Sequence, residues 1–463
     1  MKKAVKPPHA KRSTIRIETV ILAAGKGKRM YSQRPKVLHE LAGRALLHHV
    51  TDTARALGAA KVVVVYGHGG RLVPDTFNDS ALTWCEQKPQ LGTGHALKQA
   101  IPHLDAGAVA LVLYGDVPLI RAETCCKLLS AARNNGLALL TAEFPDPTGY
   151  GRVVRDSQGK VCGIVEDKDA TAQQHGIREV NTGIMAAPVA LFARWVNRLS
   201  RNNRQREYYL TDVVALAAAE GVEVSAHQPE SLWEVQGVNS NTQLAELERR
   251  FQTECASHLL EAGVTLLDPQ RLDVRGELIC GQDVVIDVGC VFEGKVELGD
   301  RVRVGAYCVV RDTRIAADTR IAPFSVIDQA AVGAECQIGP FSRIRPGTVL
   351  ERSAHIGNFV EIKNSHIDRA SKINHLSYVG DSTVGKNVNI GAGTITCNYD
   401  GKNKHETHIG DNVKIGSDTM LVAPITVGDG ASTGAGSVVT KDVEENTLVV
   451  GVPAQTIKSV DKK

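Results

Sequence analysis

The sequence is poor in aromatic residues, which make up 4% of its 463 positions, and it lacks any long uninterrupted apolar run. A membrane-spanning helix needs about 20 predominantly apolar residues, so the chain is not expected to cross a membrane. The first residues also lack the apolar segment and small-residue cleavage site of a secretory signal peptide. These absences predict a soluble, cytoplasmic protein. Apolar residues at 43% are enough to bury sizeable cores.

Acidic residues are absent from the first 16 positions, which hold six of the 54 Lys and Arg residues. The remaining 48 basic residues are matched by 51 acidic ones, so the body of the chain is slightly acidic. A nucleic-acid-binding domain would carry a basic face on its folded part, so no nucleic-acid partner is expected. We interpret residues 1–16 as a solvated, disordered basic extension, with a contact to an anionic partner as the alternative.

The ten cysteines include no Cys-x-x-Cys pair, which argues against a zinc or redox motif. In a cytoplasmic protein they are expected to be reduced thiols. Most are expected to serve as small core residues.

The first half of the chain alternates strand-like and helix-like segments. Its short β-branched apolar runs are Thr19–Leu22, Lys61–Tyr66 and Val109–Tyr114. Its segments with helical spacing include Pro35–Leu57 and Gly94–Ile101. Strands separated by helices predict an α/β domain with a mostly parallel, Rossmann-like sheet over residues 17–240.

The apolar spacing changes twice after this domain. Residues 241–262 have apolar positions three or four apart, which predicts a connecting helix. From residue 263 to 463, aliphatic residues recur every six positions, with Thr433 as one exception: Leu298, Val304, Val310; Ile315, Ile321, Ile327; Val332, Ile338, Ile344, Leu350, Ile356, Ile362; Ile409, Ile415, Leu421, Val427, Thr433, Val439. Such a repeat indicates a parallel β-helix with three hexapeptides per coil. The break between Thr396 and Ile409 predicts a loop that projects from a coil.

Directly after the first predicted strand the chain reads Leu22-Ala23-Ala24-Gly25-Lys-Gly27-Lys-Arg29-Met30, followed by Pro35-Lys36. Gly25 and Gly27 allow backbone N–H groups to approach phosphate oxygens. Arg29 and Lys36 bring positive charge to the same place. A tight turn would explain the glycines alone, whereas glycines combined with these two cations behind an opening strand favour a phosphate-binding loop.

With this motif the chain resembles the nucleotidyltransferases that build sugar nucleotides. The resemblance continues through Gln87, Leu91-Gly92-Thr93-Gly94, Tyr114-Gly115-Asp116, Gly149-Tyr-Gly151-Arg152, Glu166, Asn181 and Val238-Asn239. Together these motifs are similar to those of the bacterial bifunctional UDP-N-acetylglucosamine pyrophosphorylase and glucosamine-1-phosphate N-acetyltransferase (GlmU type). The similarity runs from about Thr19 to Val443.

The resemblance implies a set of nucleotide- and sugar-binding residues: Leu22, Ala23, Ala24, Gly25, Lys36, Gln87, Gly92, Thr93, Tyr114, Gly115, Asp116, Gly151, Glu166, Asn181 and Asn239. Within this set, Ala24, Gly25, Gln87 and Gly92 would surround the uracil. Gly151, Glu166 and Asn181 would hold the N-acetylglucosamine.

The implied reaction is in-line attack by N-acetylglucosamine-1-phosphate on the α-phosphate of UTP, which releases pyrophosphate. Asp116 and Asn239 would bind Mg²⁺, a hard cation that prefers oxygen ligands and keeps several waters. Such chemistry needs charge neutralisation and alignment more than a protein nucleophile. Arg29 would be catalytic by stabilising transition-state charge, assisted by Lys36.

Polar residues interrupt the hexapeptide pattern together: Arg345, Lys363, His375, Tyr378, Asn389, Asn398 and Tyr399. Arg345 and Lys363 are 18 positions apart, so they are expected to stack one coil apart. A lone histidine is usually structural, but these neighbours near its face favour a functional role for His375.

The same resemblance implies that His375 is the catalytic base for the glucosamine-1-phosphate amine as it attacks acetyl-CoA, a task suited to an imidazole. Arg345 and Lys363 would hold the sugar phosphate, and Tyr378 and Asn389 the sugar. The residues expected along acetyl-CoA are Ala392, Asn398, Tyr399, Ser417 and Ala435. The family implies a left-handed β-helix, a homotrimer with this site between subunits, and a product that feeds peptidoglycan and lipopolysaccharide synthesis.

The chain departs from the family pattern near its C-terminus, where it reads Val450-Gly-Val-Pro453 instead of carrying an arginine that aids CoA binding. Lys441 or Lys458 is expected to take its place. Two other functions remain open from the residues alone. One is a nucleoside-diphosphate-sugar pyrophosphorylase with an architectural β-helix, which the grouping around His375 disfavours. The other is a non-catalytic trimeric scaffold, which the phosphate loop disfavours.

Overall fold

The computed structural model describes residues 16–25, 27–134 and 136–459. The interpretation of the basic extension therefore lies outside the described residues, except for Arg16. The chain divides into two compact units, Met1–Glu248 and Arg249–Lys463. No helix among the described residues has the length and apolarity that crossing a membrane requires.

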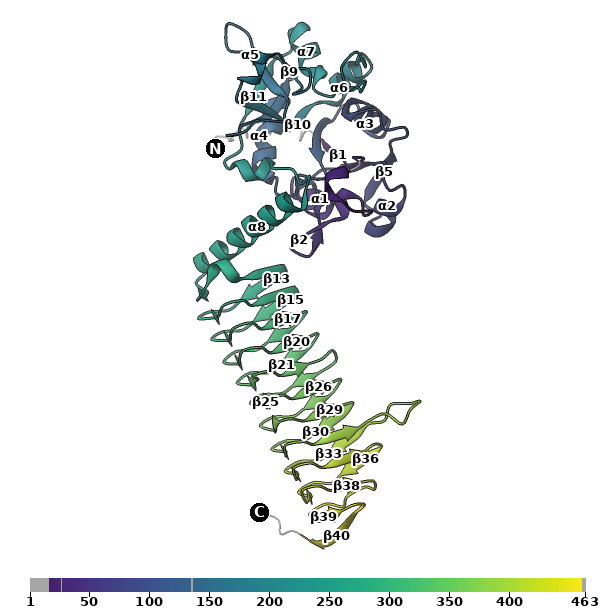
Figure 1. Ribbon diagram of the computed structural model, residues 1–463, viewed down its shortest axis with the longest axis vertical. Helices are drawn as coiled ribbons and strands as arrows, with labels where there is room; N and C mark the ends of the chain where they lie inside the picture. The colour runs from purple at the N-terminus through teal and green to yellow at the C-terminus, as the bar shows by residue number, and fades with distance from the viewer. Residues whose placement is uncertain (1–15, 26, 135, 460–463) are drawn as a thin grey trace, which may run out of the picture. The chain divides into compact units, whose positions relative to one another are not determined.

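The first unit is built on a mostly parallel sheet. Its strands lie in the order β11 (Val224–His227), β7 (Leu137–Glu143), β10 (Glu179–Pro188), β6 (Val109–Tyr114), β1 (Ile17–Leu22), β4 (Lys61–Tyr66) and β5 (Leu82–Glu86). The central strand β1 pairs in parallel with both β4 and β6. The strand β10 is antiparallel to its neighbours β6 and β7. It also pairs with β8 (Arg152–Arg155), which in turn pairs with β9 (Val161–Val165). The predicted α/β fold is confirmed (Figure 1), and the three predicted apolar runs form β1, β4 and β6.

Both faces of this sheet are covered by helices. Alternate strand residues such as Ile21 and Val64 pack with α1 (Leu46–Ala56) and α4 (Ala122–Ala132). The residues between them, such as Val20 and Val63, pack with α3 (Thr93–Ala100), α6 (Val189–Val196) and α7 (Asp212–Ala219). Burial on both faces explains why these strands are continuous apolar runs.

The predicted helix over Pro35–Leu57 is wrong in its first part. A short 3₁₀ turn (Lys36–Leu38) is followed by a hairpin of β2 (Glu40–Leu41) and β3 (Arg44–Ala45), and α1 begins only at Leu46. The hairpin turns at Ala42 and Gly43, whose φ angles are 50° and 73°. A right-handed helix cannot contain two residues with positive φ.

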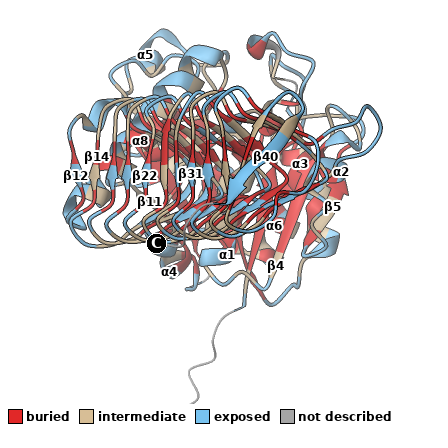
Figure 2. Cartoon of the chain, turned by 90° about the horizontal axis from the view of Figure 1, so that it is seen from below, coloured by how far each residue is buried: buried red, intermediate tan, exposed pale blue. Residues whose placement is uncertain are grey.

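The second unit is a parallel β-helix, as the six-residue period predicts. One ladder of parallel strands begins at β12 (Thr265–Leu266) and reaches β39 (Thr447–Gly451), and another runs from β13 (Asp273–Cys280) to β38 (Val438–Val439). Ile344 pairs with Ile362, 18 residues on, and Ile373 pairs with Ile390, 17 residues on. Every residue of the six-residue repeat named above is buried, and the aliphatic ones form one core. Figure 2 shows the buried segments recurring at equivalent places of successive coils.

Two elements do not belong to this repetition. The helix α8 (Asn241–Glu261) precedes the β-helix, and its first turn is capped by Ser240, whose Oγ accepts a hydrogen bond from the Gln243 amide at 3.3 Å. The predicted projecting loop lies between β32 (Ile395–Cys397) and β33 (Thr407–Ile409), and it extends from the coil beside β33 (Figure 1).

Candidate active sites

The parallel order of β1, β4 and β6 brings their following loops to one edge of the sheet. The backbone N–H of Ala23 donates to Val65 at 2.8 Å, and that of Gly115 donates to Leu22 at 3.0 Å. A cavity of about 540 Å³ opens at this edge. It is lined by the predicted residues Leu22, Ala23, Ala24, Gly25, Lys36, Gln87, Gly92, Thr93, Tyr114 and Asp116, and also by Val37, Gln90, Ala96 and Glu207.

A lysine ammonium joins the two residues predicted to bind Mg²⁺. Lys36 Nζ contacts Asp116 Oδ2 in an ion pair and donates to Asn239 Oδ1 at 3.1 Å. Both charged side chains are largely buried, at 12% and 17% exposure. Gly27 permits this placement, because it has a φ of 55° and a Cβ there would lie 2.8 Å from Lys36 Cβ. Two oxygen donors already converge on a cation, so the donor set fits Mg²⁺.

Arg29 lies beside the same pair. It lines a smaller cavity of about 210 Å³ together with Tyr114, Asp116, Tyr150 and Asn239. Tyr114 and Asp116 also line the larger cavity, so the two cavities meet at these residues. The segment after β1 therefore brings the exposed Arg29 to the cavity that Asp116 and Asn239 also line.

Residues beside β8, β9 and β10 form a polar group next to these cavities. The backbone N–H of Asn181 donates to the Gly151 carbonyl at 2.8 Å, and a Cβ on Gly151 would lie 3.5 Å from Glu166 Oε2. Thr211, which the sequence did not single out, donates its hydroxyl to Glu166 Oε1 at 2.8 Å. Burial raises the pKa of Glu166 despite that hydrogen bond. Within the described part of the chain the buried Asn181 Oδ1 accepts no hydrogen bond, so it is available to a hydroxyl or amide of a ligand.

Gln87 lines the larger cavity from the segment after β5. Its buried Nε2 donates to the Gly92 carbonyl at 2.9 Å and lies 3.1 Å from His95 Nδ1. Gly92 has a φ of 106°, and a Cβ there would lie 2.6 Å from the Tyr208 carbonyl oxygen. Only glycine fits this position, which fixes the edge of the cavity.

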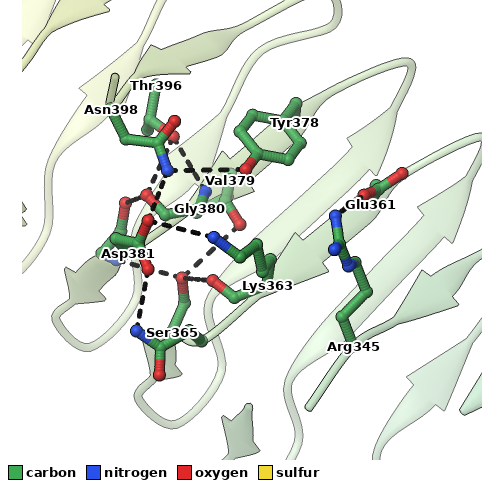
Figure 3. A network of polar contacts seen from close by, with 12 residues as sticks. Arg345, Glu361, Lys363, Ser365, Tyr378, Val379, Gly380, Asp381, Thr396 and Asn398 are labelled. Atoms are coloured by element: carbon green, nitrogen blue, oxygen red, sulfur yellow. Dashed lines mark hydrogen bonds and ion pairs between the residues drawn. The ribbon is translucent and has the colours of Figure 1, made fainter. Parts of the chain in front are cut away.

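In the second unit, neighbouring coils place four predicted residues on one sheet (Figure 3). Arg345 and Lys363 stack one coil apart as expected, because the Arg345 amide donates to the Ile362 carbonyl at 2.8 Å. The Arg345 guanidinium pairs with Glu361 at 2.8 Å. Asn398 Nδ2 lies 3.5 Å from the Tyr378 hydroxyl.

Two charged residues of this group were not found from the sequence. Asp381 pairs with Lys363 at 3.3 Å. Lys404, on the projecting loop, is close to Lys363: the contact with Lys404 and then the Asp381 carboxylate raise the pKa of Lys363, whereas Lys363 lowers the pKa of Lys404. Arg345 also lowers the pKa of Lys404. Three basic side chains, those of Arg345, Lys363 and Lys404, lie beside two carboxylates, those of Glu361 and Asp381, and this excess of positive charge favours a phosphate ligand.

His375 lies at the end of β28 (Lys372–His375) on the other sheet, together with Asn389 on β31 (Asn389–Ile390). The turn at Leu376 separates it from Tyr378, so the imidazole is not on the sheet that carries Lys363, which differs from the expected grouping. His375 Nδ1 lies 2.8 Å from Asn358 Oδ1. Since that amide oxygen can only accept, Nδ1 carries the proton and the exposed Nε2 is free to act as a base.

Three of the five residues predicted along acetyl-CoA, Ala392, Ser417 and Ala435, form a column, whereas Asn398 and Tyr399 follow β32 (Ile395–Cys397) on the other sheet. The backbone N–H of Asp418 donates to Ala392 at 2.7 Å, and that of Gly436 donates to Ser417 at 2.8 Å. The glycines that precede this column permit close stacking, because a Cβ on Gly416 would lie 2.7 Å from the Ala435 amide nitrogen. Small side chains on exposed backbone leave room for an extended ligand.

The C-terminal segment adds a hairpin to the end of this column. The strand β40 (Ala454–Ser459) pairs antiparallel with β39, and Gly451 in their turn has a φ of 101°. A Cβ on Gly434, just before Ala435, would lie 2.5 Å from Val450 Cγ1. Lys441 and Lys458 are both exposed.

An α/β unit with a cavity at the carboxyl edge of its parallel strands, followed by a hexapeptide β-helix, is the architecture of a nucleotidyltransferase joined to a second transferase unit. Three family models match it: the MobA-like NTP transferase domain over residues 19–206, the GMPPB C-terminal domain over residues 274–357, and the bacterial transferase hexapeptide (six repeats) over residues 406–441.

The relatives cover both units. The bifunctional protein GlmU of Aromatoleum aromaticum is 58% identical over 434 residues, which are 94% of this chain and 95% of the relative. That of Azoarcus sp. (strain BH72) is 59% identical, over 94% and 96% of the two chains, and that of Thiobacillus denitrificans is 59% identical, over 94% and 95%. The chain belongs to the family of bifunctional GlmU proteins and has uridylyltransferase and acetyltransferase units.

Proposed function

We propose that this chain makes UDP-N-acetylglucosamine in two reactions at two separate sites. The second unit transfers acetyl from acetyl-CoA to glucosamine-1-phosphate. The first unit then transfers uridylyl from UTP to N-acetylglucosamine-1-phosphate and releases pyrophosphate. The observation that carries the proposal is that identity of 58% to a bifunctional relative extends over 94% of the chain and includes both candidate sites. Because UTP and acetyl-CoA are cytoplasmic metabolites, we expect the enzyme in the cytoplasm, where its product serves peptidoglycan and lipopolysaccharide synthesis.

At the first site, the proposed roles are those that the family resemblance implies. Gln87 and Gly92 bound the space for uracil, and Gly151, Glu166 and Asn181 bound the space for N-acetylglucosamine. Asp116 and Asn239 would hold Mg²⁺, which supplies charge neutralisation to the phosphates. Arg29 stabilises the charge that develops on the transferred and leaving phosphates. Lys36 keeps the two metal-binding residues together and assists in charge neutralisation.

At the second site, Arg345, Lys363 and Lys404 bind the phosphate of glucosamine-1-phosphate, and Tyr378 and Asn389 bind the sugar. His375 Nε2 takes a proton from the amine as its nitrogen attacks the thioester carbonyl. Asn398, Tyr399 and the column of Ala392, Ser417 and Ala435 carry acetyl-CoA. Lys441 or Lys458 takes the place of the family's C-terminal arginine on the CoA phosphate.

We further propose a homotrimer in which this site is completed between subunits. Two features support it. His375 and Asn389 lie on one sheet and the cationic group on the other. In addition, Tyr307, Phe324, Phe341 and Phe359 form an exposed ladder of stacked rings along one corner of the β-helix, with centroid spacings of 5.4, 5.0 and 5.2 Å. A contiguous apolar stripe of this kind is typical of an interface.

The first prediction separates the two activities. His375→Ala should reduce acetyl transfer by about 10²–10⁴-fold, because it removes the general base, and should leave uridylyl transfer to N-acetylglucosamine-1-phosphate unchanged. Arg29→Ala should do the reverse, with a loss of about 10²–10³-fold in uridylyl transfer. Both rates are measured on each variant after circular dichroism has shown that it is folded.

Matched controls are His355→Ala, on the strand that pairs with β28, and Arg71→Ala, which carries an exposed ion pair to Asp75. Each should leave both rates within a few-fold of the parent. A folded variant at His375 or Arg29 that loses both activities would contradict the model of two separate sites.

The second prediction concerns the metal. Chelation with EDTA should abolish UDP-sugar formation, because the anionic Asp116 and the neutral Asn239 cannot neutralise phosphate charge without the metal that they hold. Acetyl transfer should continue, because amide formation at His375 needs no divalent cation. Added Mg²⁺ should restore the first activity. Equal loss of both activities on chelation would refute the assignment.

The third prediction concerns assembly. Light scattering should give a mass of about 150 kDa, three times the 49.7 kDa of the chain. Dilution that dissociates the trimer should abolish acetyl transfer before uridylyl transfer. A monomer that keeps full acetyl transfer would show that the site does not need a second copy.

A further inference from the structure

Asp381 is the meeting point of three side chains in the second unit. It follows β29 (Tyr378–Gly380), and its side chain is 9% exposed. Its Oδ2 accepts hydrogen bonds from Lys363 at 3.3 Å and from Asn398 at 2.5 Å, and its Oδ1 accepts from Asn364 at 2.8 Å. Figure 3 shows the side chains of Lys363 and Asn398 both directed toward this carboxylate.

Two of these partners are proposed to bind different substrates. In the proposed function, on which this inference rests, Lys363 binds the sugar phosphate and Asn398 binds acetyl-CoA. A single carboxylate oxygen receives both. We propose that Asp381 is a positioning residue for acetyl transfer, which aligns the acceptor-phosphate lysine with the acetyl-CoA asparagine and balances the cations of the phosphate site.

The charge balance follows from the groups that face this carboxylate. Lys363 and Lys404 lie against each other, Arg345 stands nearby with its partner Glu361, and Tyr378 faces Lys363. Burial disfavours the charged form of Asp381, but hydrogen bonds from Asn364, Asn398 and Lys363 outweigh it and hold the pKa of this carboxyl below its usual range. The carboxylate raises the pKa values of both Lys363 and Lys404.

Loss of the Asp381 charge should therefore lower the pKa of the lysine pair. Without it, two adjacent ammonium groups repel each other with less compensation, so the first of them loses its proton at a lower pH. A phosphate dianion binds the protonated pair. The alkaline limit of kcat/KM for glucosamine-1-phosphate should then move to lower pH, which a purely structural role of Asp381 would not produce.

The substitution Asp381→Asn isolates this charge. Asp381 has a φ of 49°, a left-handed conformation that Asn adopts as readily as Asp. Its backbone N–H donates to the Lys363 carbonyl at 2.9 Å, and this bond does not depend on the side chain. The amide is the same size as the carboxylate, so the coil is expected to remain intact.

In the Asp381→Asn enzyme we expect KM to rise about tenfold for both glucosamine-1-phosphate and acetyl-CoA, as for the loss of a hydrogen bond to a charged group. The alkaline limit should fall by about one pH unit, and uridylyl transfer should stay unchanged. The matched control is Asp429→Asn, a turn residue whose carboxylate accepts from the Asp411 backbone N–H at 2.7 Å. It should change none of these quantities.

Wild-type KM values together with an unmoved alkaline limit in Asp381→Asn would overturn the inference. A lowered melting temperature with a loss of kcat alone would also overturn it, because that pattern marks a structural residue. The His375→Ala enzyme separates this failure from failure of the proposed function. If His375→Ala keeps full acetyl transfer, the proposed function fails. If His375→Ala is inactive and Asp381→Asn behaves as the parent, only the inference about Asp381 fails.

Discussion

Parallel pairing of strands is the constraint on which both units depend. In the first unit, β1 lies between two parallel neighbours, so the segments after β1 and β6 leave the sheet at the same edge. Ala24 and Asp116 therefore meet although they are far apart in the sequence. In the second unit, each coil repeats the same pairing, so residues 17 or 18 positions apart stack. Buried aliphatic side chains fix that register, so outward-facing residues 17 or 18 positions apart are stacked as well.

The two candidate sites use the same three chemical groups in different ways. In the first, the Lys36 ammonium contacts the oxygens of both Asp116 and Asn239. In the second, the Asp381 carboxylate accepts from both Lys363 and Asn398. Each arrangement is built from a lysine, an aspartate and an asparagine, and each leaves additional positive charge for a phosphate. Removing a partner from such a buried pair costs more than the pair contributes, because a charge is left uncompensated.

The sequence predicts most of the fold, because hydrophobic period reflects which positions face a core. Its failure at Pro35–Ala45 has a local cause: Leu38, Leu41 and Ala45 have helical spacing, and Ala42 gives no sign of the positive φ that makes a hairpin. That Gly27, Arg29 and Lys36 lie near one another could be predicted because they belong to one short segment after the first strand. Asp381 and Lys404 could not, since an aspartate at a coil corner and a lysine in a loop look like ordinary surface residues until the register brings them to Lys363.

The central claim is that one chain carries both activities. It is tested most directly by incubating the purified chain with glucosamine-1-phosphate, acetyl-CoA, UTP and Mg²⁺ while free CoA, pyrophosphate and UDP-N-acetylglucosamine are measured together. The account predicts that CoA appears first, that pyrophosphate and UDP-N-acetylglucosamine follow in equal amounts, and that omission of acetyl-CoA stops all three. Pyrophosphate release that requires supplied N-acetylglucosamine-1-phosphate, with no acetyl-CoA consumed, would contradict it and indicate a pyrophosphorylase whose β-helix is only architectural.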